Sequence, residues 1–187
     1  TRGVFAGGQS GSAPNYDEYD TIDYITIASV GNATDFGDLT VQRWFAGPGG
    51  SSTRAVFGGG VSNPAGNHNT IDYITVASTG DATDFGDLTT ASGYIAGCSS
   101  SVRQVFGGGY TPSAVNVLQY VTIASAGNAT DFGDLLDTTA YATGTSNNIR
   151  GVIVGDLNPA ATDVIQYITI ASTGNSADFG NLRNVGH

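Results

Sequence analysis

Charged side chains recur at fixed positions along this sequence of 187 residues. Each of four arginines begins a short apolar segment, and each of four aspartates precedes a Phe-Gly pair. The arginines are Arg2, Arg54, Arg103 and Arg150, and the aspartates are Asp35, Asp84, Asp131 and Asp178. A ring of such charges could hold an ion, but a guanidinium also matches a carboxylate through two parallel hydrogen bonds. Because function is usually grafted onto a repeated architecture, we expect structural Arg–Asp pairs that join neighbouring units.

Groups that could catalyse a reaction are few. The chain has two histidines, His68 and His187, and one cysteine, Cys98, which lies in an apolar segment and is expected to be a packed thiol. Copper oxidation would need several His, Tyr or Cys ligands. Glycoside hydrolysis would need two carboxylates about 5–10 Å apart, so acidic loop residues such as Asp17 and Glu18 would have to converge with others. We therefore expect no enzyme activity.

Closely spaced oxygen atoms occur in the segment 32–38, Asn-Ala-Thr-Asp-Phe-Gly-Asp, as they do in calcium sites. Calcium takes about six to eight oxygen ligands, but this spacing differs from that of an EF-hand loop, and the fourth copy ends in Asn181 instead of Asp. Asp and Asn also form turns by bonding to their own backbone. We therefore expect turns here, with no metal and no cofactor. Two glycosylation sequons, at 32–34 and 128–130, lie in the same repeated turn and are interpreted as incidental.

The composition predicts an all-β fold. Lys and Met are absent, Glu18 is the only Glu, and glycine contributes 28 residues. Thr, Ser, Val, Ile and Tyr suit a pleated sheet, whereas the long unbranched side chains that suit helices are scarce. No apolar run reaches the roughly 18 residues of a membrane-spanning helix, so membrane insertion is not expected. One cysteine allows no internal disulfide.

The acidic charge bears on partners. A net charge of −10 repels phosphate backbones, so nucleic acid is not expected to bind. We interpret the acidity as a device for solubility, with cation binding or a high-salt habitat as the alternatives.

Internal repeats organise the whole chain. The segment Ile22–Ser29, Ile-Asp-Tyr-Ile-Thr-Ile-Ala-Ser, returns with small changes at 71–78, 118–125 and 165–172. The Phe of each following Asp-Phe-Gly lies at 36, 85, 132 and 179, which gives spacings of 49, 47 and 47 residues. A period of about 40–50 residues is typical of β-propeller blades. We predict one repeat domain over 1–187 with units near 1–40, 41–89, 90–136 and 137–187.

Each unit can hold four strands separated by turn residues. For the second unit the predicted strands are 93–98, 54–57, 70–77 and 83–89. The 70–77 type of strand is apolar on both sides: in the first copy Ile22 and Tyr24 share one face, while Ile25 and Ile27 share the other. A strand with two apolar faces must be covered on both, so we expect the units to pack radially against one another.

With these strands placed, the unit resembles the kelch repeat, which has a strand ending in a Gly pair, then a Tyr strand, then a Trp strand. Phe57-Gly58-Gly59 matches the Gly pair, Tyr73 the Tyr and Phe85 the Trp, although Phe replaces Trp throughout and 154–156 reads Val-Gly-Asp. The amino-acid sequence of the repeat also resembles kelch-like arrays in structural and tail-fibre-type proteins of marine bacteriophages. That resemblance implies a four-bladed β-propeller, a virion or extracellular location and an attachment role.

Closure of the ring is left open by the repeats. The fourteen residues that separate the Leu39-type position from the next repeat Arg have no full counterpart after Leu182 or before Arg2. Three arrangements remain: four blades closing with a clipped strand, four blades of a larger ring in a longer parent chain, or a second chain that supplies the remainder. We favour the closed four-bladed ring.

Binding is expected on one face. The turns that follow the Ile22-type strands are nearly identical in all units, whereas the loops before these strands differ in length and content. Loops on a rigid scaffold carry recognition, and aromatic rings suit sugars and proteins alike. The candidate contacts are Tyr16, Asp17, Tyr19, Trp44, His68 and Tyr110. We expect a module that attaches to host-surface glycan or protein; the alternatives are a fibre or virion element without a ligand, and a glycosidase-like propeller.

Overall fold

The computed structural model describes residues 1–12, 15–156 and 162–183, and every regular element in these ranges is a β-strand. The prediction of an all-β fold is therefore confirmed. No helix in the described ranges is long and apolar enough to cross a membrane. His187, one of the two histidines considered above, lies outside them.

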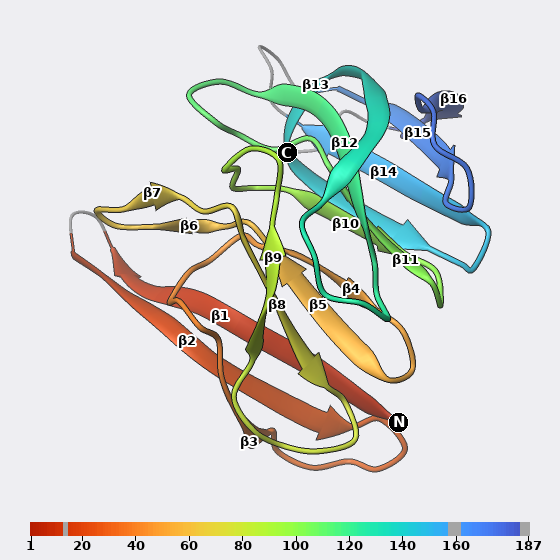
Figure 1. Ribbon diagram of the computed structural model, residues 1–187. Helices are drawn as coiled ribbons and strands as arrows, with labels where there is room; N and C mark the ends of the chain where they lie inside the picture. The colour runs from red at the N-terminus through yellow and green to blue at the C-terminus, as the bar shows by residue number, and fades with distance from the viewer. Residues whose placement is uncertain (13–14, 157–161, 184–187) are drawn as a thin grey trace.

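The strands form antiparallel sheets in chain order (Figure 1). The first sheet contains β1 (Arg2–Ser12), β2 (Asn15–Thr26) and β3 (Thr34–Asp38). The second contains β4 (Gly47–Gly50), β5 (Arg54–Gly58), β8 (Thr70–Thr75) and β9 (Thr83–Asp87). A small hairpin, β6 (Val61–Ser62) and β7 (Gly66–Asn67), forms the third. The largest sheet contains β10 (Ala96–Ser99), β11 (Arg103–Gly107), β12 (Val115–Thr122), β13 (Thr130–Ser146), β14 (Arg150–Asp156), β15 (Val164–Thr169) and β16 (Ala177–Asn181).

The seven-stranded sheet consists of two halves that share β13. Residues 130–139 of β13 pair with β12, and residues 140–146 pair with β14, with a register shift between Ala140 and Thr143. The chain thus contains four successive units: β1–β3; β4, β5, β8 and β9; β10–β12 with the first part of β13; and the second part of β13 with β14–β16. We call them the first to fourth units.

Three of the four strands predicted for the second unit are confirmed. The predicted segments 70–77 and 83–89 contain β8 and β9, and the predicted segment 54–57 is one residue shorter than β5. The assignment of 93–98 is wrong: Ala96 pairs with Gly107, so β10 opens the third unit, and β4 is the first strand of the second. The short connection after β9 carries the chain on to the next unit instead of back to its own.

The hydrophobic core lies between units. One cluster joins Ile22 and Phe36 of the first unit to Phe57 and Ile74 of the second. The next two boundaries repeat this arrangement with equivalent residues. The strands that were predicted to be apolar on both faces are therefore covered on both sides wherever a neighbouring unit is present.

Backbone hydrogen bonds connect each turn to the unit before it. Gly80 N donates to Phe36 O at 2.7 Å, Gly127 N to Phe85 O at 2.6 Å, and Gly174 N to Phe132 O at 2.7 Å. These turns are the near-identical segments of the repeat, and their sequence is explained by this contact. We call it the turn latch.

The prediction that the repeat arginines pair with the repeat aspartates is wrong, because the arginines contact other groups. The guanidinium carbons of Arg2, Arg54, Arg103 and Arg150 lie 4.3–4.7 Å from the ring centroids of Tyr24, Tyr73, Tyr120 and Tyr167. The first three also donate to backbone carbonyl groups of the following unit, such as Arg54 Nη1 to Ile123 O at 2.8 Å. Arg2, Arg54 and Arg103 therefore join neighbouring units as expected, but they bind a backbone carbonyl oxygen and not an Asp carboxylate.

Two of the repeat aspartates form hydrogen bonds within their own turns. Asp84 and Asp178 accept from the backbone N–H of the glycine two residues later. In the described ranges, neither they nor Asp35 and Asp131 form an ion pair with a repeat arginine; the single ion pair there joins Arg43 and Asp72. Turn chemistry explains the recurrence of these carboxylates.

The four-unit ring favoured above is not closed in the described ranges. The first and fourth units lie at opposite ends of the array (Figure 1). Phe5 of the first unit is 59% exposed and Phe179 of the fourth is 55% exposed, whereas Phe36, Phe85 and Phe132 are each 2% exposed. The first unit has three strands instead of four, so β1 ends the sheet. The expected closure fails because the two end units do not cover each other's apolar faces.

Candidate functional site: an aromatic cluster between the units

An aromatic residue occupies the same position in each of three connections between units. Phe45 and Tyr94 lie in the loops after β3 and β9, and Tyr141 lies in the middle of β13, where pairing passes from β12 to β14. Phe45, Tyr94 and Tyr141 each lie six residues after the buried leucine that ends a unit: Leu39, Leu88 and Leu135. Their φ angles are 55°, 56° and 56°. A side chain with a Cβ atom is uncommon in this left-handed region, and strained residues of this kind cluster at functional sites.

Hydrogen bonds hold each connection at its start. The residue after the leucine donates to the side chain that precedes the tyrosine of the next unit's central strand. Thr40 Oγ1 donates to Asp72 at 2.6 Å, Thr89 N to Gln119 at 2.7 Å, and Leu136 N to Gln166 at 2.9 Å. These three acceptors are buried, so each bond is shielded from water.

The glycine pair of the repeat holds the middle of the same connection. Gly8 N donates to Arg43 O at 3.0 Å, Gly60 N to Ser92 O at 2.9 Å, and Gly109 N to Thr139 O at 2.7 Å. The preceding glycines have φ near +66°, which glycine adopts without strain. The glycine pairs thus fix the carbonyl group two residues before each aromatic residue.

A buried ion pair replaces part of this pattern in the second unit. Asp72 stands where the third and fourth units have Gln119 and Gln166, and its carboxylate lies 3.0 Å from Arg43 Nη2. Both side chains are fully buried. Burial lowers the pKa of Arg43, while the charge and hydrogen bond of Asp72 oppose that shift. The pair anchors the connection that carries Phe45.

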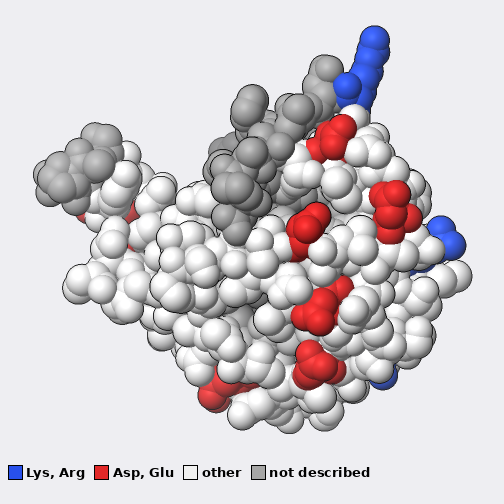
Figure 2. All heavy atoms as spheres, turned by 90° about the horizontal axis from the view of Figure 1, so that it is seen from above, with Lys and Arg blue, Asp and Glu red and all other residues white. Residues whose placement is uncertain are grey.

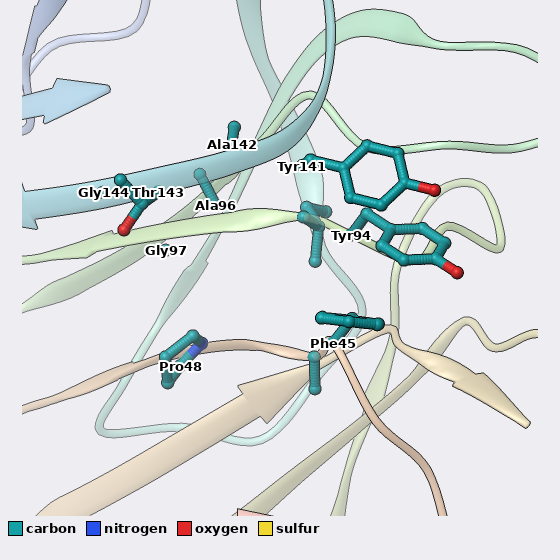
Figure 3. A pocket seen from close by; sticks show the side chains of 11 residues that line it. Phe45, Pro48, Tyr94, Ala96, Gly97, Tyr141, Ala142, Thr143 and Gly144 are labelled. Atoms are coloured by element: carbon teal, nitrogen blue, oxygen red, sulfur yellow. The ribbon is translucent and has the colours of Figure 1, made fainter. Parts of the chain in front are cut away.

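The three rings stack against one another beside a cavity (Figure 3). The centroid of Tyr94 lies 4.6 Å from that of Phe45 and 4.2 Å from that of Tyr141. The cavity has a volume of about 350 Å³ and is otherwise lined by small or apolar residues, including Pro48, Ala96 and Gly144. Figure 3 shows the rings side by side at one end of it, with the hydroxyl groups of Tyr94 and Tyr141 pointing the same way.

The cluster is uncharged. Partial burial, and then the neighbouring Tyr94, raise the pKa of Tyr141, so its phenol stays protonated at neutral pH. Acidic groups gather elsewhere: burial, followed by the charges of Asp20, Asp81 and Asp35, raises the pKa of Asp38. Figure 2 shows separate acidic patches on one face of the molecule, with basic side chains at its margin.

Three of the residues predicted to bind belong to an extended aromatic cluster. Trp44 lies 6.3 Å from Tyr16 and 6.5 Å from Phe45, and Tyr110 lies 6.5 Å from Tyr94, as centroid distances. Tyr16 and Tyr110 are exposed, but Trp44 is buried, and its indole N–H has no partner among the described residues. Trp44 is therefore a buried member of the cluster that packs against Tyr16 and Phe45.

The other three predicted residues lie outside the cavity. Asp17 and Tyr19 line a second groove, which Tyr16 of the extended cluster also lines, and there the Tyr19 hydroxyl is 2.8 Å from Ser10 Oγ. His68 is half-buried, with Nε2 2.6 Å from Ser62 Oγ. Its pKa is lowered, first by burial and then by Arg43. The structure thus brings these residues to the variable loops without joining them to the cavity.

Sequence reasoning missed Phe45, Tyr94 and Tyr141 as site residues. Their signal was present, because each occupies the same repeat position. Tyr94 fell within a segment interpreted as a strand, however, and Phe45 and Tyr141 were not singled out, although Trp44 beside Phe45 was. The stack became visible only when consecutive connections were placed side by side.

No model of a known protein family matches this chain, and a comparison with curated protein sequences finds no match either. The site must therefore be interpreted from its own geometry.

Proposed function

We propose that this chain is a non-enzymatic attachment module that binds carbohydrate at the cluster of Phe45, Tyr94 and Tyr141. The observation that carries the proposal is the stack of three rings at one edge of an open cavity of about 350 Å³. A pyranose ring has apolar C–H faces and a polar hydroxyl rim. Aromatic rings that carry hydroxyl groups, such as those of Tyr94 and Tyr141, complement both.

The proposal includes the fold family and the location. We interpret the four units as blades of a kelch-like β-propeller, as the Gly pairs and the Tyr strands suggest. Glycines such as Gly59 and Gly108, which belong to these pairs, have φ near +66°. The connections that carry the rings would then meet near the axis of the ring. A host-surface glycan is the expected ligand, and a virion or extracellular surface the expected location.

The chemistry of the cavity favours a neutral ligand. Among the described residues no charged side chain lines it, and its walls are glycine, alanine, proline, aromatic residues, Ile95 and Thr143. Small-molecule sites are commonly concave, apolar and equipped with a few polar groups. The side chain of Thr143 supplies such a polar group here. The hydroxyl groups of Tyr94 and Tyr141 lie at the outer ends of their rings and point away from Pro48 and Thr143 (Figure 3).

A glycan array followed by titration tests the proposal. Trp44 is the only tryptophan, and its ring lies 6.5 Å from that of Phe45, so its fluorescence should change when a sugar binds. We expect Tyr94→Asn to weaken binding of the best glycan at least about tenfold, or about 1.4 kcal/mol. Asn tolerates the left-handed backbone, so the variant should fold.

Tyr19→Ala is the matched control. It removes an exposed tyrosine from the variable-loop face without touching the cavity, and it should leave the affinity unchanged. Equal binding by Tyr94→Asn and the parent chain would refute the site. An array with no bound glycan would favour a fibre or virion element that binds no ligand.

A further inference from the structure

The boundary between successive units is built three times from equivalent residues. The preceding unit contributes what we call a trailing face, formed at the first boundary by Ile22, Phe36 and Leu39. The following unit contributes a leading face, formed there by Phe57 and Ile74. Phe85 and Phe106 occupy the same roles at the second boundary, and Phe132 and Ile153 at the third.

The fourth unit has a trailing face that no unit in the described part of the chain covers. Its residues at the equivalent positions are Ile165, Phe179 and Leu182. Phe179 is 55% exposed, although the three equivalent phenylalanines are 2% exposed. The repeat thus presents the same apolar surface at its end that it buries at each internal boundary.

The first unit has a leading face that is likewise uncovered by any unit within residues 1–12, 15–156 and 162–183. Phe5 is 59% exposed, whereas its equivalents Phe57, Phe106 and Ile153 are 5%, 0% and 1% exposed. Ile27 is 62% exposed, whereas its equivalents Ile123 and Ile170 are 2% and 0% exposed. Both halves of the internal boundary are therefore present on one molecule, on surfaces that face solvent.

Polar groups on the two end faces also match. At internal boundaries the turn latch is a hydrogen bond from a glycine N–H to a phenylalanine carbonyl group. A second hydrogen bond lies beside it, in which the Asp or Asn that follows this glycine accepts from a backbone N–H of the preceding unit, as Asn128 does from Asp87 N. Gly31 and Asn32 of the first unit stand at these turn positions, and Phe179 and Asn181 of the fourth unit stand at the positions that receive them.

The repeat arginine completes the match. Arg54 stacks on Tyr73 and donates to the carbonyl group of Ile123 in the next unit. Arg150 stacks on Tyr167 in the same way, and the equivalent acceptor is the carbonyl group of Ile27. Because Ile27 belongs to the opposite end of the array, this donor and this acceptor meet only when two ends come together.

We propose that the leading face of one copy of this chain docks on the trailing face of a second copy, and so continues the internal boundary between molecules. The contact joins two different surfaces, so it is head-to-tail and not two-fold symmetric. Strands already in place form much of both faces: Phe5 lies in β1, and Ile165 and Phe179 lie in β15 and β16. This inference does not rest on the proposed sugar site, although Phe5 of the leading face lines a pocket that shares Ala46 and Pro48 with the cavity of that site.

Sedimentation velocity across a range of protein concentrations up to about 1 mM tests the proposal. We expect the mass of the parent chain to rise with concentration. Phe179→Asp, which damages the trailing face, and Ile27→Asp, which damages the leading face, should each weaken association at least about tenfold, because a carboxylate would be buried without a partner. Ile149→Asp, at a similarly exposed position in the turn between β13 and β14, should change it less than about twofold.

A mixture of the two face variants distinguishes the geometry. Phe179→Asp keeps an intact leading face and Ile27→Asp keeps an intact trailing face, so an equimolar mixture should form a dimer and nothing larger. A parent chain that stays monomeric throughout the range would overturn the proposal. So would a monomer that loses stability in both variants, because that result would mean that the two ends of one chain close on each other.

Discussion

At the scale of single residues, the left-handed backbone at Phe45, Tyr94 and Tyr141 is the feature most closely tied to function. Holding such a residue costs of order 1–3 kcal/mol, and glycine would remove that cost. Glycine is abundant in this chain, with 28 residues, yet all three positions carry rings. Contacts within the stack offset part of the strain, since aromatic pairs contribute about 0.5–1.5 kcal/mol each. We attribute the remaining strain to function, because the three strained residues place their aromatic rings at the cavity of the proposed sugar site.

Cys98 leads to a prediction at the same scale. Its Sγ atom is buried and lies 3.5 Å from the carbonyl oxygens of Thr145 and Val152. Burial raises the pKa of this thiol to about 12. Because the thiolate is the reactive form, we expect a thiol reagent at pH 8 to label the folded chain at least about a hundredfold more slowly than the chain unfolded in urea. Equal rates would contradict the buried position.

The same pKa shift predicts the direction of a pH effect. A folded-state pKa of about 12, against the ordinary value of 9.0, means that folding favours the neutral thiol. The associated stability is complete below pH 9 and is lost as the pH rises from 9 towards 12. Urea unfolding should show the midpoint falling in this window, and Cys98→Ala should show a smaller fall because the contribution of the buried thiol is then absent.

At the scale of elements, the turn latch is the contact that sets the spacing of the units. Gly86 in β9 has φ +139°, and a Cβ atom there would lie 2.6 Å from the carbonyl group of Gly127 in the next unit. Gly180 in β16 has φ +137°, but a Cβ atom at that position would have no neighbouring atom within 4 Å. An alanine at either position would carry the same backbone strain, but only at Gly86 would it also meet a turn of the next unit.

This pair gives a matched test of the latch. We expect Gly86→Ala to lower the free energy of unfolding by about 1–3 kcal/mol more than Gly180→Ala. Both variants carry the backbone strain of a left-handed alanine, so the difference reports the contact with Gly127. Chemical denaturation measures it, and equal losses would show that the turns do not hold the units together.

Elements also show where sequence reasoning succeeds. The central strands, such as β8 with Ile71, Tyr73 and Ile74, are apolar and β-branched, and their positions were predicted correctly. The first strands were harder, because β4 reads Gly-Pro-Gly-Gly and carries no hydrophobic period. Its assignment depends on pairing with β5, which is a long-range property that no local pattern reveals.

At the scale of the whole molecule, charge opposes the association proposed above. Each copy carries a net charge of −10, so two copies repel each other over about one Debye length, roughly 10 Å at 0.1 M salt. We expect the dissociation constant of the parent chain to fall when sodium chloride is raised from about 0.05 to 0.5 M. Sedimentation at both concentrations measures the change. Weaker association at high salt would indicate an interface held by ion pairs instead of the apolar faces.

The sequence by itself determined the strand content, the four repeats and the apolar character of both faces of the central strands. Those features follow from local composition and from a period that can be counted, so they need no knowledge of distant contacts. Tertiary structure decided which partner each arginine takes, which unit each first strand joins and whether the ends meet. It also brought Phe45, Tyr94 and Tyr141 together, because residues nearly fifty positions apart become neighbours only when units pack side by side.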